Sequence, residues 1–242
     1  MSSVELETPA PGVRLLRLAD PDRRNALSPA LQADLGTALD AVADERPRAL
    51  VVTGAGKAFC AGADLSATFG PPGLPVPAVR DRLRATYDSF LRVRRLPIPT
   101  IAAVQGAAVG AGVNLALACD VRIVGPRARF GVTFSRLGLH PGGGCTHFLV
   151  RALGPQRALS LLLDGATLDA EEAHRAGLVL AIAEDPVAEA VETATRWAEL
   201  DPGLVADVKR AVTMATDGAF EDVLEFESWA QASSVTTSAA LR

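Results

Sequence analysis

Two runs of small residues, each preceded by an apolar segment, restrict the fold of this chain more than any other feature. Residues 60–65 read Cys-Ala-Gly-Ala-Asp-Leu, and residues 110–115 read Gly-Ala-Gly-Val-Asn-Leu. The apolar segments before them, Ala49–Thr53 and Ile98–Val104, have the composition of buried strands. Small residues let a ligand approach the backbone closely, and two N–H groups aimed at one carbonyl oxygen form an oxyanion hole. One such run alone is more typical of a tight turn or a close helix contact than of a ligand site.

The N-terminal part of the chain predicts a strand, a helix and a second strand. Val13–Leu18 and Ala49–Thr53 are the strand candidates. Between them, Ser28 and Pro29 form a helix start, with Ser as the N-cap and Pro at the first helical position. The apolar residues that follow share one helical face: Leu31, Leu35, Leu39 and Val42. This order of elements favours a parallel sheet.

The later segments are assigned by composition. Val121–Val124 is another strand candidate. The segment Gly70–Pro77 is rich in Gly and Pro and can be neither a helix nor a central strand, so it is predicted to be a mobile loop. Arg80–Arg95 is predicted to be a helix, and beyond about residue 143 the chain reads as nearly all helix. Three residues mark helix starts there: Pro155, Asp169 and Pro202.

The composition excludes several classes of protein. The 242 residues are 49% hydrophobic and 21% charged, with a formal net charge of -4. No basic block stands out, so we expect no nucleic-acid partner. No run reaches the roughly 18 apolar residues of a membrane span, and Met1–Glu5 lacks the basic and apolar regions of a secretory signal. We therefore expect no membrane contact and a cytoplasmic location, which fits three cysteines without CxxC spacing: Cys60, Cys119 and Cys145.

Motifs over most of the chain resemble those of the crotonase (enoyl-CoA hydratase/isomerase) family. In order, they are Arg23–Leu27, Ala58–Leu65, Ala103–Gly106 continuing through Gly110–Gly112 to Leu117–Asp120, Phe130–Gly131, Gly138, Pro141–Gly144 and Ala176–Val179. The resemblance implies an α/β fold with a ββα spiral core over about residues 1–185. It also implies a helical C-terminal region over about residues 186–242, within a single domain. In relatives that region builds a trimer, so a homotrimer or a dimer of trimers is expected.

The resemblance also implies how a substrate is held. It makes the N–H groups of Ala63 and Ala111 the oxyanion hole for the thioester of an acyl-CoA or enoyl-CoA. Four residues are implied to contact the CoA part of the substrate: Arg24, Ala61, Asp64 and Leu65. The alternative for Arg24 is a plain surface charge. CoA enters with the substrate, and no other cofactor and no metal is expected.

Two positions depart from the family pattern. Family hydratases use two glutamates that hold and activate water and deliver the α-proton. The first would stand three residues after Ala111, where this chain has Asn114, and the second four residues after Phe130, where it has Phe134. An amide can hold a water but cannot accept a proton, and a phenyl ring can do neither. Hydration by the two-glutamate mechanism is therefore not expected.

Another residue would have to handle protons. His140, just before the turn Pro141–Gly144, is the candidate acid or base because imidazole titrates near neutral pH. The alternative is a histidine hydrogen-bonded to the backbone beside that turn. Asp64 is a second candidate base, at a position that often has a local structural role. Strand alternation is expected to point Ser135 and Arg136 away from the ring of Phe134.

Two functions of different classes remain open from the residues. The first is an enzyme that stabilises a thioester enolate, with isomerisation, decarboxylation, C–C cleavage or slow hydration as its reaction. The second is a non-catalytic acyl-CoA carrier or sensor that has kept the thioester cradle without the acid–base pair. Turnover of CoA thioesters measured beside their binding would separate the two.

Overall fold

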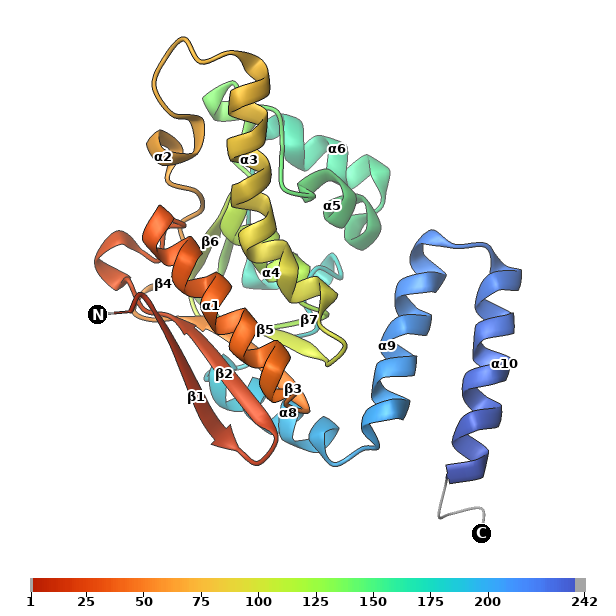
Figure 1. Cartoon of the computed structure of the whole chain (residues 1–242). Coiled ribbons are helices and arrows are strands. Elements are labelled where there is room, and N and C mark those ends of the chain that lie inside the picture. Colours follow the sequence, from red (N-terminus) through yellow and green to blue (C-terminus); the bar gives the residue numbers. More distant parts are fainter. Residues whose placement is uncertain (1, 238–242) are drawn as a thin grey trace.

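The computed structural model of the chain describes residues 2–237 (Figure 1). It is an α/β structure with two sheets and helices around them, as the resemblance implied. Met1 and residues 238–242 lie outside the described part, so the end of the predicted helical region 186–242 does too.

The larger sheet has six strands in the order β1-β2-β3-β5-β7-β10. Its strands are β1 (Val4–Ala10), β2 (Val13–Leu18), β3 (Ala49–Gly54), β5 (Thr100–Val104), β7 (Val121–Val124) and β10 (Ala181–Ile182). Only β1 pairs antiparallel, with β2, and the other neighbours are parallel. The strands predicted at 13–18, 49–53 and 121–124 are confirmed, and the one predicted from Ile98 begins at Thr100.

The smaller sheet has four strands in the order β4-β6-β8-β9. They are β4 (Ala58–Cys60), β6 (Ala107–Val109), β8 (Arg129–Gly131) and β9 (Thr167–Asp169). The first three are parallel, and β9 is antiparallel to β8. This sheet positions the site because β4 and β6 lead directly into the two small-residue runs.

Two helices cover opposite faces of the larger sheet (Figure 1). The helix α1 (Pro29–Glu45) is capped by Ser28, whose side chain accepts from the Leu31 N–H at 3.2 Å. Its predicted apolar face is buried against the inward side chains of one sheet face, including Leu16 and Val52. The helix α8 (Pro186–Ala198) packs on the other face through residues such as Ala190.

The remaining helices follow the turn chemistry of the sequence. They are α2 (Leu65–Phe69), α3 (Val76–Leu91), α4 (Ala111–Ala118), α5 (Cys145–Leu153), α6 (Pro155–Asp164), α7 (Ala170–Arg175), α9 (Pro202–Asp217) and α10 (Phe220–Thr237). The predicted starts are confirmed, because Pro155 and Pro202 begin helices and Asp169 caps α7.

Two predictions about secondary structure need correction. The strands β9 and β10 interrupt the nearly all-helical region, and α3 begins inside the predicted loop because a proline is tolerated in the first turn of a helix.

The helices α9 and α10 form an antiparallel pair beside the rest of the chain (Figure 1). Both expose large apolar side chains to solvent: Leu204, Val208, Val212, Phe220, Leu224, Trp229 and Val235. Among residues 2–237, none of the helices combines the length and the hydropathy needed to cross a membrane.

Candidate functional site

The structure brings the two small-residue runs into contact. Cys60 of β4 pairs with Ala108 of β6, so the runs leave adjacent parallel strands side by side. A Cβ atom on Gly112 would lie 2.2 Å from the Cys60 carbonyl oxygen, and one on Gly62 would lie 2.6 Å from the Val109 oxygen. Gly62 also has φ +96°, a conformation that residues with a side chain rarely adopt. Glycine is therefore required at both contacts.

A cavity of about 340 Å³ opens against these runs. It is bounded by both runs, by α2 and α3, and by the segment that ends at Gly142. Most of the predicted site residues line it: Ala61, Ala63, Leu65, Ala111, Asn114, Phe134 and His140. Arg24 and Asp64 are not among its lining residues.

Ala63 and Ala111 both line this cavity. Ala111 is the first residue of α4, where an N–H group has no partner within its own helix. Ala63 lies opposite Leu27. The Leu27 N–H donates to the Gly62 oxygen at 2.8 Å, and the Leu27 oxygen accepts from the Asp64 N–H at 3.4 Å, so Leu27 is hydrogen-bonded to the two neighbours of Ala63. Within residues 2–237, neither of the two alanine N–H groups donates a hydrogen bond. Both N–H groups are therefore without an acceptor in the described chain.

Arg24 and Asp64 hold the first run in place from outside the cavity. Arg24 is exposed with φ 54°, and its carbonyl accepts from the Ala61 N–H at 2.9 Å. The Asp64 carboxylate caps α2 by accepting from the Ala67 N–H at 3.1 Å, and Arg23 donates to it at 2.8 Å. These hydrogen bonds, that of Ala67 foremost, lower the pKa of Asp64. The structural role weighed for Asp64 fits this geometry better than a role as base.

Asn114 is buried against the glycine turn. It is 1% exposed, and its Nδ2 donates to the Gly142 oxygen at 2.8 Å. Its Oδ1 is buried and has no hydrogen-bond partner among the described residues. Phe134 lies nearby, because a Cβ on Gly110 would meet the Phe134 Cζ at 3.8 Å.

The prediction that Ser135 and Arg136 alternate along a strand is wrong. They belong to a 3-10 helix, Ser135–Leu137, which ends at Gly138 in the left-handed conformation. The Gly138 N–H returns to the Ser135 oxygen at 3.0 Å, so the chain turns immediately after Phe134. A glycine three residues after a serine signals such a turn better than strand periodicity does.

His140 lies at the cavity mouth with its orientation set by the backbone. It is exposed, and its Nδ1 lies 2.7 Å from the Pro141 oxygen. A carbonyl oxygen only accepts, so this contact assigns the proton of the neutral ring to Nδ1 and leaves Nε2 as the acceptor. The sequence left two alternatives for His140, a place at the site or a hydrogen bond to the backbone. In the structure His140 has both. The other two histidines, His147 and His174, lie in α5 and α7 and do not line the cavity.

Sequence reasoning missed three residues of the site. Asn25 is fully buried with φ 56°, and its Nδ2 donates to the Ala58 oxygen at 2.8 Å, which fixes the strand before the first run. Tyr87 of α3 lines the cavity, and burial raises the pKa of its hydroxyl. Thr68 of α2 lines the cavity as well. A buried Asn in the left-handed conformation suits a turn, but nothing in the sequence places α2 and α3 over the site.

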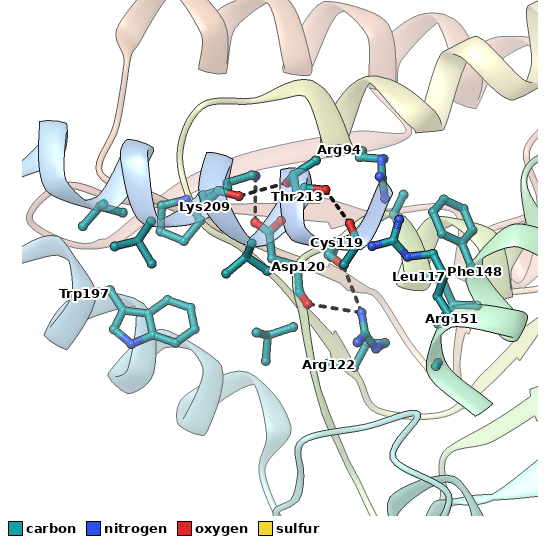
Figure 2. A pocket seen from close by; sticks show the side chains of 18 of the residues that line it. Arg94, Leu117, Cys119, Asp120, Arg122, Phe148, Arg151, Trp197, Lys209 and Thr213 are labelled. Carbon is teal, nitrogen blue, oxygen red and sulfur yellow. Dashed lines mark hydrogen bonds and ion pairs between the residues drawn. The ribbon is translucent and has the colours of Figure 1, made fainter. Parts of the chain in front are cut away.

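A larger cavity of about 550 Å³ lies elsewhere, between α9 and the core (Figure 2). None of the predicted site residues lines it. At its base, the Lys209 Nζ lies 2.7 Å from Asp120 and donates to the Ile98 oxygen at 2.7 Å. Apolar side chains, including Phe148 and Trp197, form much of its wall (Figure 2).

Comparisons with known proteins agree on one family. Residues 9–240 match the family model described as enoyl-CoA hydratase/isomerase. A probable enoyl-CoA hydratase of Mycobacterium tuberculosis is 55% identical over 183 residues, which cover 75% of this chain and 70% of the relative. The 1,2-epoxyphenylacetyl-CoA isomerase of Escherichia coli K12 is 36% identical over 220 residues, covering 89% of this chain and 84% of the relative.

Solved structures give the same result. The enoyl-CoA hydratase of Bacillus anthracis matches with a TM-score of 0.90 at 33% identity, covering 98% of this chain and 92% of the other. A Thermobifida fusca YX protein solved in complex with CoA matches with a TM-score of 0.84 at 28% identity, covering 98% and 94%. The chain therefore belongs to the enoyl-CoA hydratase/isomerase, or crotonase, family of proteins that process acyl-CoA, as its motifs predicted.

Proposed function

We propose that this chain binds an acyl-CoA thioester in the 340 Å³ cavity and polarises its carbonyl with the N–H groups of Ala63 and Ala111. The observation that carries the proposal is that both alanines line the cavity and that neither backbone N–H has an acceptor in the described chain. Such donors stabilise the negative charge that develops on the thioester oxygen, and each contributes roughly 2.7–4 kcal/mol in other enzymes. We propose no cofactor beyond the CoA of the substrate.

The reaction that fits the cavity best is a double-bond isomerisation. The residues that line the cavity include no Asp, Glu, Lys or Arg, so no carboxylate of the described chain is at hand to activate water. A shift of a double bond needs only one base, which removes a proton from one carbon and returns it to another while the oxyanion hole holds the enolate. The His140 Nε2 supplies that base in this proposal, since Nδ1 is engaged by Pro141. One relative, 36% identical, is named as an isomerase of an epoxide-bearing CoA thioester, so isomerisation of a CoA thioester has a precedent among the relatives, though not a double-bond shift.

A carrier or sensor of acyl-CoA is the second candidate. It is favoured by the exposure of His140, because a base at the cavity mouth is poorly shielded from competing water. Turnover separates the two functions. We expect conversion of 3-enoyl-CoA to 2-enoyl-CoA thioesters, lost by roughly 10²-fold in His140→Gln. Tight binding without conversion of any CoA thioester would instead support the carrier.

The CoA part of the substrate is proposed to lie along the first run. Leu65 is 47% exposed and offers an apolar contact to pantetheine, and Ala61 lies beside it in the cavity wall. Asp64 would contribute through its backbone, because its carboxylate is occupied by Ala67 and Arg23. The exposed Arg24 is proposed to meet a CoA phosphate. Arg24→Ala should weaken binding of CoA more than binding of dephospho-CoA.

We also propose that the chain assembles as a homotrimer or a dimer of trimers. Support comes from the apolar side chains that α9 and α10 expose and from the 550 Å³ groove beside α9 (Figure 2). Val212 lines that 550 Å³ cavity and is 61% exposed, so Val212→Asp should shift the chain toward monomer in light scattering.

The three cysteines are free and buried, which supports a reducing compartment such as the cytoplasm.

A further inference from the structure

The glycine turn that follows His140 is contacted by side chains from two helices. Residues 139–142 have no regular secondary structure, and residues 143 and 144 form a turn that leads into α5. A Pro-Gly-Gly-Gly segment has many backbone conformations when it is free. One conformation is therefore kept only if neighbouring side chains select it. These side chains also affect His140, because its Nδ1 lies 2.7 Å from the oxygen of Pro141 in this segment.

Gly142 is a glycine for a different reason from the two glycines that follow it. Gly143 and Gly144 have φ +64° and +84°, in the left-handed region that residues with a side chain rarely adopt. Gly142 is outside that region, so its backbone conformation is open to other residues. However, a Cβ on Gly142 would lie 2.1 Å from the Tyr87 hydroxyl oxygen and 2.9 Å from the Tyr87 Cζ. The contact with Tyr87 is therefore what requires glycine at this position.

Tyr87 is itself fixed by the core. It belongs to α3, and its ring packs edge-on against Phe90, with the ring centroids 6.3 Å apart and an interplanar angle of 65°. Phe90 is fully buried, so it anchors the Tyr87 ring. The same ring lies against Gly143, whose added Cβ would meet the Tyr87 Cδ1 at 3.2 Å. Tyr87 thus forms a rigid surface along two consecutive residues of the turn.

Asn114 holds the same two glycines from a second helix, α4. Its Nδ2 donates to the Gly142 oxygen at 2.8 Å, and a Cβ on Gly143 would lie 2.8 Å from that nitrogen. Asn114 is 1% exposed, and α4 is also the helix that begins at Ala111. Groups supported by rigid helices are held more precisely than groups on a loop alone. The turn is therefore joined both to α3 and to the helix of the proposed oxyanion site.

We propose that Tyr87 is a positioning residue, which acts through the Pro141–Gly143 segment to fix the His140 ring at the mouth of the cavity. This inference rests on the proposed function, in which the His140 Nε2 is the base, and adds the residue that keeps this base in place. The Tyr87 hydroxyl fills the space beside Gly142. Without it the segment gains room to move, and a displacement of about 1 Å at a reacting group can cost roughly 10²-fold in rate.

A double-mutant cycle tests the contact between Tyr87 and Gly142 without any need for activity. Gly142→Ala, Tyr87→Phe and the double variant are compared with the wild type by urea-induced unfolding. Gly142→Ala should lower the unfolding midpoint strongly, and it should lower it less in the Tyr87→Phe background, because the hydroxyl that the new Cβ meets is gone. Equal losses in both backgrounds would overturn the inference. If neither alanine variant folds, the His140 ring in Tyr87→Phe decides it.

The state of the His140 ring is a readout that a merely structural role of Tyr87 would leave unchanged. Near pH 8, where a histidine ring is neutral, its ¹⁵N chemical shifts report the share of the Nδ1–H tautomer, which the Pro141 oxygen favours. Tyr87→Phe should lower that share. Asp88→Ala is the matched control and should not, because Asp88 is exposed on α3 and paired with Arg95. An unchanged share in Tyr87→Phe would overturn the inference.

Turnover separates this inference from the proposed function. With a 3-enoyl-CoA substrate, Tyr87→Phe should lower kcat about tenfold, leave KM within about twofold and keep the inflection that His140 gives to the pH profile. Loss of that inflection, or a rise in KM with kcat unchanged, would contradict a positioning role. No turnover by the wild type would overturn the proposed base, while the double-mutant cycle and the tautomer share would still decide whether Tyr87 fixes His140.

Discussion

An alanine at Gly62 should damage both the fold and the site, and its cost can be worked from the backbone. The added Cβ would lie 2.6 Å from the Val109 oxygen and 3.5 Å from the Ala111 nitrogen. Positive φ costs a residue with a Cβ about 1–2 kcal/mol. Forcing extra atoms into a packed contact costs about 1–3 kcal/mol more. Gly62→Ala should therefore lower the free energy of unfolding by about 2–5 kcal/mol.

The matched control is Gly73→Ala. Gly73 has a similar φ of +88°, but nothing lies within 4 Å of its added Cβ. It should lose only the conformational part, about 1–2 kcal/mol, in urea-induced unfolding followed by circular dichroism. The added Cβ also pushes the two runs apart, so the folded Gly62→Ala variant should lose roughly 10²-fold in thioester turnover or affinity. If the two variants lose equal stability and both keep thioester affinity, the close approach of the runs does not build the site.

Three further predictions concern stability. Thr68→Val should raise the free energy of unfolding of the unliganded protein by roughly 1–3 kcal/mol, because the buried Thr68 hydroxyl has no hydrogen-bond partner among the described residues; a lower melting temperature would contradict this. Burial raises the pKa of Cys60 from 9.0 to about 12, so the folded state holds its proton where the unfolded state loses it. Stability should therefore fall as pH rises from 9 toward 12, with a shallower slope in Cys60→Ala. Lys209→Met should speed amide exchange in α9, because Lys209 ties that helix to Asp120 and Ile98; unchanged exchange would show that the tether is dispensable.

Elements with a clear periodicity were predictable from the sequence, and short ones were not. The apolar face of α1 and its Ser28–Pro29 start gave that helix its correct position, and β2, β3 and β7 are apolar runs with sharp ends. The strands of the smaller sheet have only three residues each, too few to show a period of two. These short strands form because they pair with other strands. The partner residues are distant in the sequence, so the local pattern does not indicate the strands.

The same distinction holds for the site. The small-residue runs around Gly62 and Gly112 predicted a close backbone approach, because glycine tolerates contacts that a Cβ forbids. Tyr87 and Thr68 could not be found this way, since their place over the cavity depends on how α2 and α3 pack. The segment after Phe134 was misjudged because a strand period was assumed there, although the spacing from Ser135 to Gly138 is typical of a turn.

The most direct test of the account is the carbonyl stretching frequency of a bound thioester, measured by isotope-edited infrared spectroscopy with a ¹³C-labelled acyl-CoA. Two hydrogen bonds from Ala63 and Ala111 in a water-poor cavity should lower that frequency below its value in water. Ala111→Pro removes one N–H group at the first position of α4, where proline is tolerated, and should shift the frequency partway back. A saturated complex whose carbonyl absorbs as it does in water, with no change in the proline variant, would contradict the oxyanion assignment.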